Sequence, residues 1–250
     1  MNFIWEDLKF FVTCLKNLSV SESLMLDNDK GFCVSTGCDL DSWVFYPEHV
    51  NDSGIVKEAM NFFNSREISF IFPVYDSDEE HKKIFEDCGL FLLDTYTAMV
   101  FESGKILHPE TNSLITIKHV KSSESSREWA DTSWRGFGGL DDVPENYYRF
   151  VEAMSDDREN LSLYTAEYNG MNAGTFIITN EENYTGVYYF ATVPEMRRKG
   201  IARSMMNGIC RLSAGKDIVL HATTEGLPFY KNFGFKELFT IPIYSNEKES

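Results

Sequence analysis

The chain has 250 residues, a length that one large domain or two domains of ordinary size could fill. Hydrophobic residues make up 43% and aromatic residues 14% of the sequence, which is enough apolar material for a core and excludes intrinsic disorder. The net charge of −16, from 39 acidic and 23 basic residues, excludes nucleic acid as a partner and would attract a cationic substrate, although it could equally serve solubility alone.

The sequence predicts a cytoplasmic protein without a membrane partner or a metal. No apolar run is long enough to cross a membrane, and the first residues carry acid where a secretory signal carries positive charge. Five cysteines are an odd count, which favours free thiols over disulfides. Cys33 and Cys38 have no second Cys or His pair near them in sequence, so zinc is not expected.

The first half alternates expected helices and strands. Apolar residues recur at helical spacing over 4–15, and short β-rich runs end at Pro or Gly. Gly89 fits a left-handed helix end. The expected elements are helices over 4–15, 55–64 and 81–87, and strands over 43–46, 68–74 and 90–101.

A polar stretch with Gly and Pro, residues 105–112, predicts a linker between an N-terminal domain at 1–104 and a second domain at 113–250. The second domain opens with an expected strand over 114–120, helices over 125–134 and 144–154, and a strand over 161–168. Asn169-Gly170 is a strong signal for a type I′ turn, which predicts a hairpin with a strand over 174–179. Another apolar strand follows over 186–193.

Two segments of the chain resemble each other, which suggests an internal duplication. Residues 84–90 (Ile-Phe-Glu-Asp-Cys-Gly-Leu) lie over residues 229–235 (Phe-Tyr-Lys-Asn-Phe-Gly-Phe), and an apolar β segment follows each. Gly54 precedes Phe85 by nearly the same distance as Gly200 precedes Tyr230.

The strand over 186–193 ends at Pro194, and Arg197-Arg198-Lys199-Gly200-Ile201-Ala202 then opens a helix whose apolar face includes Ile201, Met205 and Ile209. The free N–H groups of a first helical turn and the helix dipole favour a phosphate at this position. The turn lacks the glycine patterns of nucleotide-triphosphate and dinucleotide loops. On these residues alone, the alternative remains that the segment is an ordinary basic connection between a strand and a helix.

Together, Val193-Pro-Glu-x-Arg-Arg-Lys-Gly-Ile-Ala202 and Ala222-Thr-x-x-Gly-x-x-x-Tyr-x-x-x-Gly-Phe235 resemble the two cofactor motifs of the GNAT acetyltransferase superfamily, over residues 113–250. The resemblance implies an α/β (α+β) fold with a mixed, mostly antiparallel sheet flanked by helices, in two tandem copies. It also implies an acetyl-CoA-dependent N-acyltransferase, for groups other than amino-acyl groups, acting on a small-molecule or peptide amine. The N-terminal copy looks degenerate because residues 51–54 supply acid where the motif has a basic turn.

The resemblance further implies the contacts of acetyl-CoA. The backbones of Ala191 and Val193 would pair with the pantetheine amides, and Thr223 and Phe229 would border the pantetheine arm. Backbone N–H groups of one continuous run would hold the pyrophosphate: Arg198, Lys199, Gly200, Ile201, Ala202, Arg203 and Ser204.

Tyr230 would lie near the sulfur, where a phenol can hydrogen-bond or protonate the leaving thiolate, an uphill transfer of only about 2 kcal/mol at ordinary pKa values. A core aromatic is the alternative. An alkylamine with a pKa of about 10.4 costs about 4.6 kcal/mol to deprotonate at pH 7, so a base or a water relay is needed. Relatives place a glutamate where this chain has Thr185-Gly186.

Other groups are weaker candidates for the base. Glu167, Asp141 and Asp142 are interpreted as solvated surface charges, and His221 as a packed histidine in a strand. Glu195 is expected to pair with a neighbouring cation. A Gly-rich loop at 134–139 could line the acceptor pocket or be a plain turn.

Three functions stay open: an active acetyltransferase, a non-catalytic acyl-CoA-binding sensor or regulatory module, and a structural α/β protein without a cofactor. The N-terminal half could be a surface for forming a homodimer, a lid over the acceptor, or a vestige.

Overall fold

The structure is a computed structural model that describes residues 6–8, 11, 14, 25–28, 31–35, 42–45, 53–74, 79–104, 112–155 and 160–247. Its contacts divide the chain into two compact units. Unit 1 comprises Met1–Ala98, Ala222–Phe229 and Glu237–Ser250, and unit 2 comprises Met99–His221 and Tyr230–Lys236. Two C-terminal segments therefore group with the N-terminal half. Apart from Asn112, the predicted linker lies outside the described residues, and separately folding domains at 1–104 and 113–250 stay a prediction.

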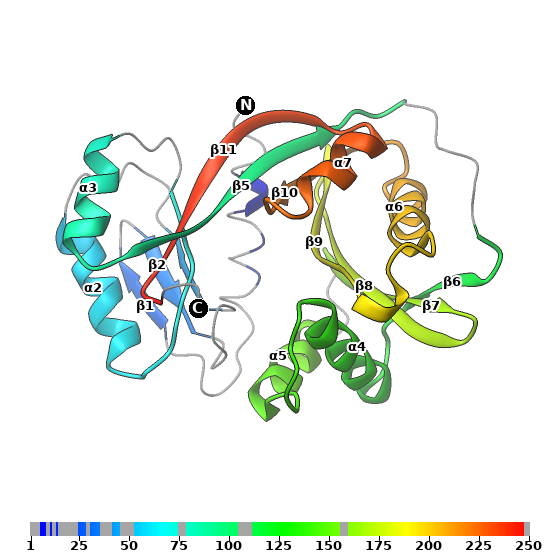
Figure 1. Cartoon of the computed structure of the whole chain (residues 1–250), viewed down its shortest axis with the longest axis horizontal. Coiled ribbons are helices and arrows are strands. Elements are labelled where there is room, and N and C mark those ends of the chain that lie inside the picture. Colours follow the sequence, from blue (N-terminus) through cyan, green and yellow to red (C-terminus); the bar gives the residue numbers. More distant parts are fainter. Residues whose placement is uncertain are drawn as a thin grey trace. The chain divides into compact units, whose positions relative to one another are not determined.

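Unit 1 contains two helices whose whole length the structure describes, together with short strands (Figure 1). Its buried core is rich in aromatic side chains. An antiparallel sheet is formed by β1 (Met25–Asn28), β2 (Gly31–Val34) and β3 (Trp43–Phe45). The remaining elements are α2 (Ser53–Asn64), β4 (Phe72–Pro73), α3 (Glu79–Asp87), β5 (Phe91–Phe101) and β11 (Lys236–Ser245). β5 and β11 each continue into unit 2, at Met99 and Lys236. β11 pairs antiparallel with β4, and the ring of Tyr244 stacks on Phe85 at 4.7 Å.

The elements predicted in this half are largely present. Residues 6–8, 11 and 14 are helical, while the other residues of the predicted helix over 4–15 lie outside the described part of the chain. The strand predicted over 68–74 is reduced to Phe72–Pro73, with an isolated bridge between Ile71 and Trp43. Pro73 has no N–H to donate, so a longer ladder cannot continue through it.

Unit 2 is built on a five-stranded run of sheet in the order β10-β9-β8-β7-β6. Its pairs are antiparallel except for the parallel pair of β9 and β10, which confirms the mixed, mostly antiparallel sheet flanked by helices. The elements are β6 (Ile115–His119), α4 (Ser123–Gly136), α5 (Glu145–Ser155), β7 (Leu161–Tyr168), β8 (Met171–Asn180), β9 (Tyr184–Thr192), a 3-10 turn η1 (Pro194–Met196), α6 (Ile201–Leu212) and β10 (Asp217–Ala222). A last helix, α7 (Leu227–Phe233), passes from unit 1 to unit 2 between Phe229 and Tyr230.

Local signals explain the elements of unit 2. Asn169 and Gly170 both have positive φ, 53° and 80°, as the predicted type I′ turn between β7 and β8 requires. Ser122 and Ser125 form a reciprocal capping box at the start of α4. Ile201, Met205 and Ile209 are buried along one face of α6, as the apolar spacing predicts.

Helices cover both faces of this sheet (Figure 1). A Cβ on Gly136 of α4 would lie 2.8 Å from the Cβ of Ala191, whereas a Cβ on Gly174 would lie 3.0 Å from Met205 of α6. Gly174 pairs with Thr192, and Ala191 pairs with the next residue along, Thr175. Because side chains alternate along a strand, α4 and α6 lie on opposite faces.

The two segments that resemble each other in sequence, residues 84–90 and 229–235, also share a backbone conformation. In unit 1, α3 is followed by Gly89 at φ 86°, and the N–H of Leu90 donates to the carbonyl of Phe85 at 3.0 Å. After α7, Gly234 has φ 113°, and the N–H of Phe235 donates to the carbonyl of Tyr230 at 3.0 Å. The two segments therefore share one helix–glycine–strand conformation, with Phe85 at the position of Tyr230.

The upstream half of the predicted duplication does not match. Gly200 precedes α6 with φ 84°, in the left-handed region. Gly54 lies inside α2, in its first turn, and is not among the glycines with positive φ. The predicted equivalence of Gly54 and Gly200 is wrong, because the two glycines have different backbone conformations and only one of them begins a helix. A degenerate N-terminal copy of the second domain stays a proposal.

Candidate functional site

An irregularity in β9 shapes the centre of unit 2. Thr175 pairs with Ala191 and Ile177 pairs with Tyr188, so β9 carries one residue more than β8 between these pairs. This β-bulge includes Tyr189, whose φ of 48° is unusual for a residue with a side chain. The Oγ1–H of Thr175 donates to the carbonyl of Tyr189 at 3.2 Å. The bulge was not predicted, because the run 186–193 reads as a continuous strand and nothing in its residue types requires a positive φ.

β9 and β10 pair over only part of their length. The parallel register runs from Asp217 with Tyr184 to Leu220 with Val187 and ends there. β9 nevertheless continues to Thr192 and β10 to Ala222. The edge of β9 that faces β10 is therefore not used by that strand beyond Val187, on the side of the bulge away from β8.

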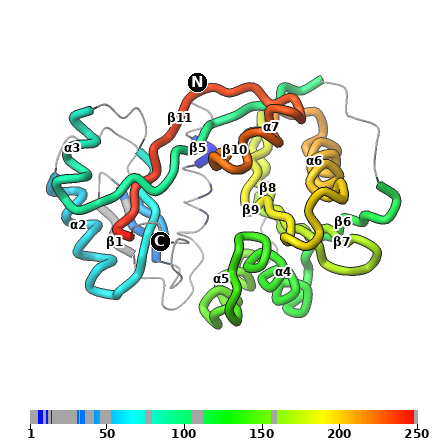
Figure 2. The backbone as a smooth tube through the Cα atoms, viewed as in Figure 1, coloured from blue at the N-terminus to red at the C-terminus, as the bar shows by residue number. Residues whose placement is uncertain are grey.

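The chain then turns into α6 through a short segment with two left-handed residues (Figure 2). Arg198 has φ 63° and Gly200 has φ 84°. Gly200 is the N-cap of α6, and no side chain of the described residues caps this helix end. The first intrahelical bond joins the N–H of Ser204 to the carbonyl of Gly200 at 3.0 Å. The N–H groups of the preceding turn lack carbonyl partners within the helix, which is the local arrangement of an anion site.

The charges around this turn favour an anion. The first turn of α6 contains no acidic residue, and Arg198 and Lys199 are exposed. Arg197 instead holds the local backbone, because its Nε–H donates to the carbonyl of Thr192 at 3.3 Å and its Nη2–H to the carbonyl of Gly136 at 3.4 Å. Arg197 therefore fixes the turn against β9 and α4, whereas Lys199 places its ammonium 3.2 Å from the sulfur of Met196 and over the ring of Tyr168.

This geometry divides the predicted pyrophosphate donors of α6 into residues with a free N–H position in the helix and one residue whose N–H is already bonded. Ile201, Ala202 and Arg203 occupy the first three positions of α6, where backbone N–H groups have no intrahelical acceptor. The N–H of Ser204, in contrast, already donates to the carbonyl of Gly200, and the predicted role of Ser204 as a backbone donor to pyrophosphate stays a prediction.

At the end of β9, the two residues that are predicted to pair with the pantetheine amides direct their backbone groups to β8. The N–H of Val193 donates to the carbonyl of Ala173 at 3.0 Å, so it is not available to a pantetheine amide. Ala191 lies two residues earlier, opposite Thr175, and therefore presents its N–H and C=O to the same neighbour, β8. Thr192 lies between them and presents its backbone groups to the other edge of β9. The pantetheine contacts predicted for Ala191 and Val193 stay predictions, and Thr192 is the residue between them whose backbone groups point away from β8.

Thr223 and Phe229 belong to unit 1. The carbonyl of Thr223 accepts from the N–H of Leu227 at 3.0 Å, and its Oγ1 accepts from the N–H of Gly226 at 3.2 Å, so this residue caps the start of α7. The position of Thr223 and Phe229 beside the pantetheine arm stays a prediction.

Tyr230 is buried in an aromatic setting in unit 2. Its ring lies 5.9 Å from that of Phe190 and 5.6 Å from that of Phe235, and only 9% of the residue is exposed. Burial raises the pKa of the Tyr230 phenol well above its ordinary value of 10. The proton transfer to a thiolate considered from the sequence is therefore more costly than about 2 kcal/mol, and hydrogen-bond donation is the role that this environment favours.

His221 lies on β10 just after the last residue paired with β9. The residue is partly exposed, but both ring nitrogens are buried and neither has a hydrogen-bond partner within the part of the chain that the structure describes. Its ring lies 6.2 Å from that of Tyr188. Burial lowers the pKa of the imidazole to about 4, which keeps it neutral at pH 7.

We expect a fall in pH from 7 to 5 to cost the native chain about 2 kcal/mol more unfolding free energy than the His221→Asn variant. The folded pKa of about 4 lies below the unfolded value of 6.5, so this stabilisation is complete above pH 6.5 and is lost toward pH 4. Asparagine does not titrate. Urea unfolding of both proteins at the two pH values measures the difference, and equal losses would mean that His221 protonates freely in the folded state.

The carboxylates considered as bases are engaged elsewhere or exposed. Glu167 forms an ion pair with Lys118 across β6 and β7 at 2.5 Å. Asp141 and Asp142 are exposed in the connection between α4 and α5. Glu195 pairs with Arg135 of α4, not with a cation of its own loop as expected. Surface pairs of this kind contribute little to stability.

An aromatic cluster surrounds the bulge on the α4 face. The ring of Tyr189 lies 5.8 Å from Trp129, 5.9 Å from Phe137 and 6.4 Å from Phe150. Phe137 is 60% exposed, and Leu140, which follows in the same connection, is 97% exposed. The Gly-rich loop is folded over Trp134, whose Nε1–H donates to the carbonyl of Asp141 at 3.2 Å. An apolar surface therefore borders the bulge.

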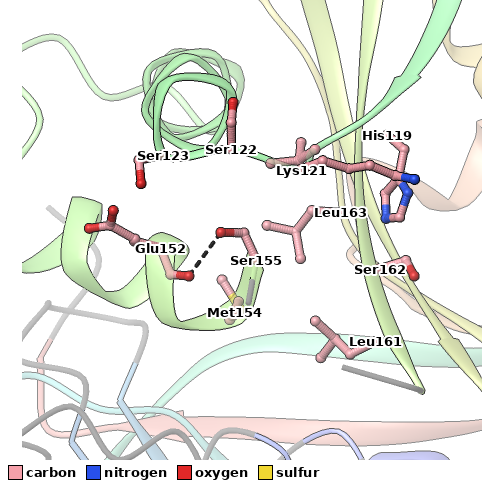
Figure 3. Close-up of a pocket in the computed structure, with 11 residues that line it drawn as sticks. His119, Lys121, Ser122, Ser123, Glu152, Met154, Ser155, Leu161, Ser162 and Leu163 are labelled. Carbon is pink, nitrogen blue, oxygen red and sulfur yellow. Dashed lines mark hydrogen bonds between the residues drawn. The ribbon is translucent and has the colours of Figure 1, made fainter. Parts of the chain in front are cut away.

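A cavity of about 350 Å³ lies elsewhere in unit 2 (Figure 3). It is lined from the end of β6, the first turn of α4, the last turn of α5 and the start of β7, and its lining includes His119, Lys121 and Glu152. Leu161 at its rim pairs with Thr179, which pairs with Gly186 near the beginning of β9. The turn into α6 follows the other end of β9, so this cavity is not part of the predicted site.

The described residues show neither a membrane-spanning helix nor a cluster of metal ligands. None of the helices in the described residues is both long and apolar enough to cross a membrane. Within the same residues, no group of three or more His, Cys, Asp and Glu side chains is arranged to hold a metal ion.

Comparison with known proteins agrees with this geometry. Residues 159–237 match the family model described as "Acetyltransferase (GNAT) domain". Among solved structures, a functionally unknown conserved protein from Staphylococcus epidermidis ATCC 12228 is similar with a TM-score of 0.64 and 12% identity, over 90% of this chain and 94% of that chain. A GCN5-related N-acetyltransferase from Kribbella flavida gives 0.61 and 14%, over 95% and 94%.

A tandem GNAT protein from the clavulanic acid biosynthesis pathway gives a TM-score of 0.55 and 10% identity, over 88% of this chain and 80% of that chain. At these identities the similarity concerns the fold alone. No curated protein matches this chain in sequence.

Proposed function

We propose that the protein transfers the acetyl group of acetyl-CoA to a primary amine of a small molecule or peptide, and the match of residues 159–237 to the acetyltransferase (GNAT) domain model supports this. The amine attacks the thioester directly while both substrates are bound. The observation that carries this proposal is the start of α6, where a helix without a side-chain cap follows two left-handed residues and two exposed cations.

The diphosphate of the cofactor fits the first turn of α6. The N–H groups of Ile201, Ala202 and Arg203 point along the helix axis toward the turn, where the helix dipole favours negative charge. Arg198 and Lys199 add positive charge, and Gly200 leaves open space, because a Cβ at this position would meet no atom within 4 Å. Three backbone N–H groups and two cationic side chains thus belong to one short segment, which can hold a ligand carrying several negative charges.

The arm of the cofactor would continue along β9. The N–H of Thr192 is directed to the edge that β10 leaves beyond Val187, while its carbonyl accepts from Arg197, and an extended chain of amides can pair with such an edge as a strand does. This path runs from the turn toward the bulge at Tyr189. The thioester would then reach the gap between β9 and β10, beside Tyr230.

The chemistry requires help for the leaving sulfur. As the C–N bond forms and the C–S bond breaks, negative charge develops on sulfur, and the Tyr230 hydroxyl can donate a hydrogen bond to it. Burial keeps this hydroxyl protonated through the neutral range. The thiolate then takes its proton from solvent, for which its ordinary pKa of about 8.5 is sufficient.

The acceptor would approach from the α4 face. Tyr189, Phe137 and Leu140 offer apolar contact there, and the strongly acidic chain attracts a cationic amine over a longer range. We therefore propose an acceptor that carries its amine next to an apolar or aromatic group. This makes aromatic alkylamines and the N-termini of apolar peptides the first compounds to test.

We expect acetyl-CoA at 100 times its Kd to stabilise the full chain by about 2.7 kcal/mol, which is measurable as a rise in Tm. Release of free thiol should then be followed across amines that include aromatic alkylamines, apolar peptides and polyamines. Desulfo-CoA, which keeps the diphosphate but has no thiol to acylate, is the control for binding alone. Absence of any shift in Tm would reject the proposed cofactor, whereas binding without turnover on every amine would favour an acyl-CoA sensor.

A further inference from the structure

His221 lies at the point where β9 and β10 part. Leu220 is the last residue of β10 that pairs with β9, and His221 follows it directly. Its ring contacts Tyr188, the residue of β9 that follows the last paired residue, Val187. Both residues thus lie at the closed end of the gap in which the thioester is proposed to sit.

The side chain of His221 is on the α4 face of the sheet. Val187 pairs with Leu220, so their successors Tyr188 and His221 share the opposite face. Tyr188 pairs with Ile177, which lies on the same face of β8 as Thr175, the partner of Ala191. Ala191 packs against Gly136 of α4. His221 therefore lies on the face from which the acceptor is proposed to approach.

Tyr230 lies on the other side of this gap. Its ring contacts Phe190, whose side chain alternates with that of Ala191 and so is directed to the face that carries α6. A reaction at the gap would find the hydroxyl of Tyr230 on the α6 side and the imidazole of His221 on the α4 side. Two groups on opposite faces suit a reaction in which one bond forms as another breaks.

The two ring nitrogens of His221 lower the stability of the folded protein when no ligand is bound. Both nitrogens are buried, and neither has a hydrogen-bond partner among the residues that the structure describes, so two polar atoms are left unsatisfied there. A histidine that served packing alone would be replaced at lower cost by a residue without these nitrogens. Glu167 forms an ion pair, whereas no ion pair of His221 is found within those residues, and burial is the cause of its lowered pKa.

We propose that His221 is the group that accepts the proton of the acceptor nitrogen. This proposal rests on the acetyltransferase function proposed above. The neutral amine donates its lone pair to the thioester carbon, the C–N bond forms, and the electrons of the C=O bond move to oxygen. The nitrogen then carries a positive charge, and one of its protons passes to the unprotonated ring nitrogen of His221.

The remaining steps balance the reaction. The carbonyl re-forms, the C–S bond breaks, and sulfur leaves as a thiolate that takes a proton from water. The imidazolium of His221 releases its proton to water. The sum is one amine and one thioester converted into one amide and one thiol. A weak base is sufficient for this role, because bonding to carbon makes the protons on nitrogen far more acidic than those of the free alkylammonium.

The test compares two kinds of amine in the full-length protein. His221→Leu removes both nitrogens, His221→Gln retains a polar group, and Val219→Ala perturbs a buried neighbour on the same face of β10 without removing a base. Single-turnover rates are measured with saturating acetyl-CoA, an alkylamine found active in the screen, and hydroxylamine. Hydroxylamine is weakly basic, so its nitrogen loses a proton to water without help once the C–N bond has formed.

We expect His221→Leu to lower the rate with the alkylamine about 10- to 100-fold, and the rate with hydroxylamine less than about threefold. The Kd of acetyl-CoA should stay within about twofold, and Val219→Ala should affect both amines equally. Equal losses with both amines in His221→Leu, or an unchanged rate with the alkylamine, would overturn the role of His221 and leave the acetyltransferase intact. If the native protein neither binds acetyl-CoA nor acetylates an amine, the proposed function itself fails and His221 has no reaction to serve.

Discussion

Replacement of Gly200 by aspartate is expected to raise the Kd of acetyl-CoA by at least about 100-fold, the largest effect of any single change in the proposed site. The new carboxylate would stand at the N-terminus of α6, about 4 Å from the bound diphosphate, where repulsion costs about 1–4 kcal/mol. A side chain at φ 84° also introduces about 1 kcal/mol of backbone strain, which lowers the stability of the free and the bound protein alike and does not enter Kd. A loss of about 3 kcal/mol corresponds to a factor of about 100 in Kd.

Two control variants separate charge from strain. Gly200→Asn introduces a side chain of the same size without the charge and tolerates the left-handed region, so it should weaken binding by less than about tenfold. Gly215→Asp places the same residue at the same φ of 84°, also with no atom within 4 Å of the new Cβ, in the turn after α6. Calorimetric titration with CoA measures all three. If Gly215→Asp were as damaging as Gly200→Asp, the cofactor would not be held at the start of α6.

Tyr230→Phe is expected to lower the rate of acetyl transfer by about 10- to 1000-fold while the Kd of acetyl-CoA stays within about twofold. Phenylalanine keeps the ring that contacts Phe190 and Phe235, so packing is preserved and only the hydroxyl is lost. Because burial raises the pKa of Tyr230, the native hydroxyl stays protonated, and the loss should be constant between pH 6 and 9. Single-turnover rates at several pH values measure it.

Tyr244→Phe provides the matched control for Tyr230→Phe. Tyr244 is also buried, stacks on Phe85 in unit 1 and likewise has its pKa raised by burial, yet it belongs to no part of the proposed chemistry. The same change at this position should leave the transfer rate within about twofold. A native rate in Tyr230→Phe would remove the hydroxyl from the mechanism and leave Tyr230 as a core aromatic.

Elements that depend on neighbouring residues could be predicted from the sequence. The type I′ turn at Asn169-Gly170 follows from two residues that tolerate positive φ, and the end of α3 follows from Gly89. The strand, basic turn and helix around Gly200 carry their own signals of apolar spacing and charge. For the same reason, the first turn of α6 could be identified before any coordinates were known.

The features that could not be predicted depend on how distant segments pair. Alternation along β9 decides which backbone groups point away from β8, and the bond between Val193 and Ala173, twenty residues earlier, sets that alternation at the end of the strand. The bulge at Tyr189 arises in the register of β8 against β9. His221 could be recognised as a strand residue, but its position where β10 leaves β9 depends on a parallel pairing that no local signal encodes.

The grouping of β11 with unit 1 sets an order in which the chain can fold during its synthesis. Unit 2 needs nothing beyond Lys236, whereas unit 1 includes Glu237–Ser250, with the strand that pairs with β4 and the tyrosine that stacks on Phe85. The earlier segments of unit 1 must therefore wait for a segment that is synthesised after all of unit 2. A premature stop after Lys236 would spare the contacts within unit 2 and leave the aromatic core of unit 1 without its closing strand.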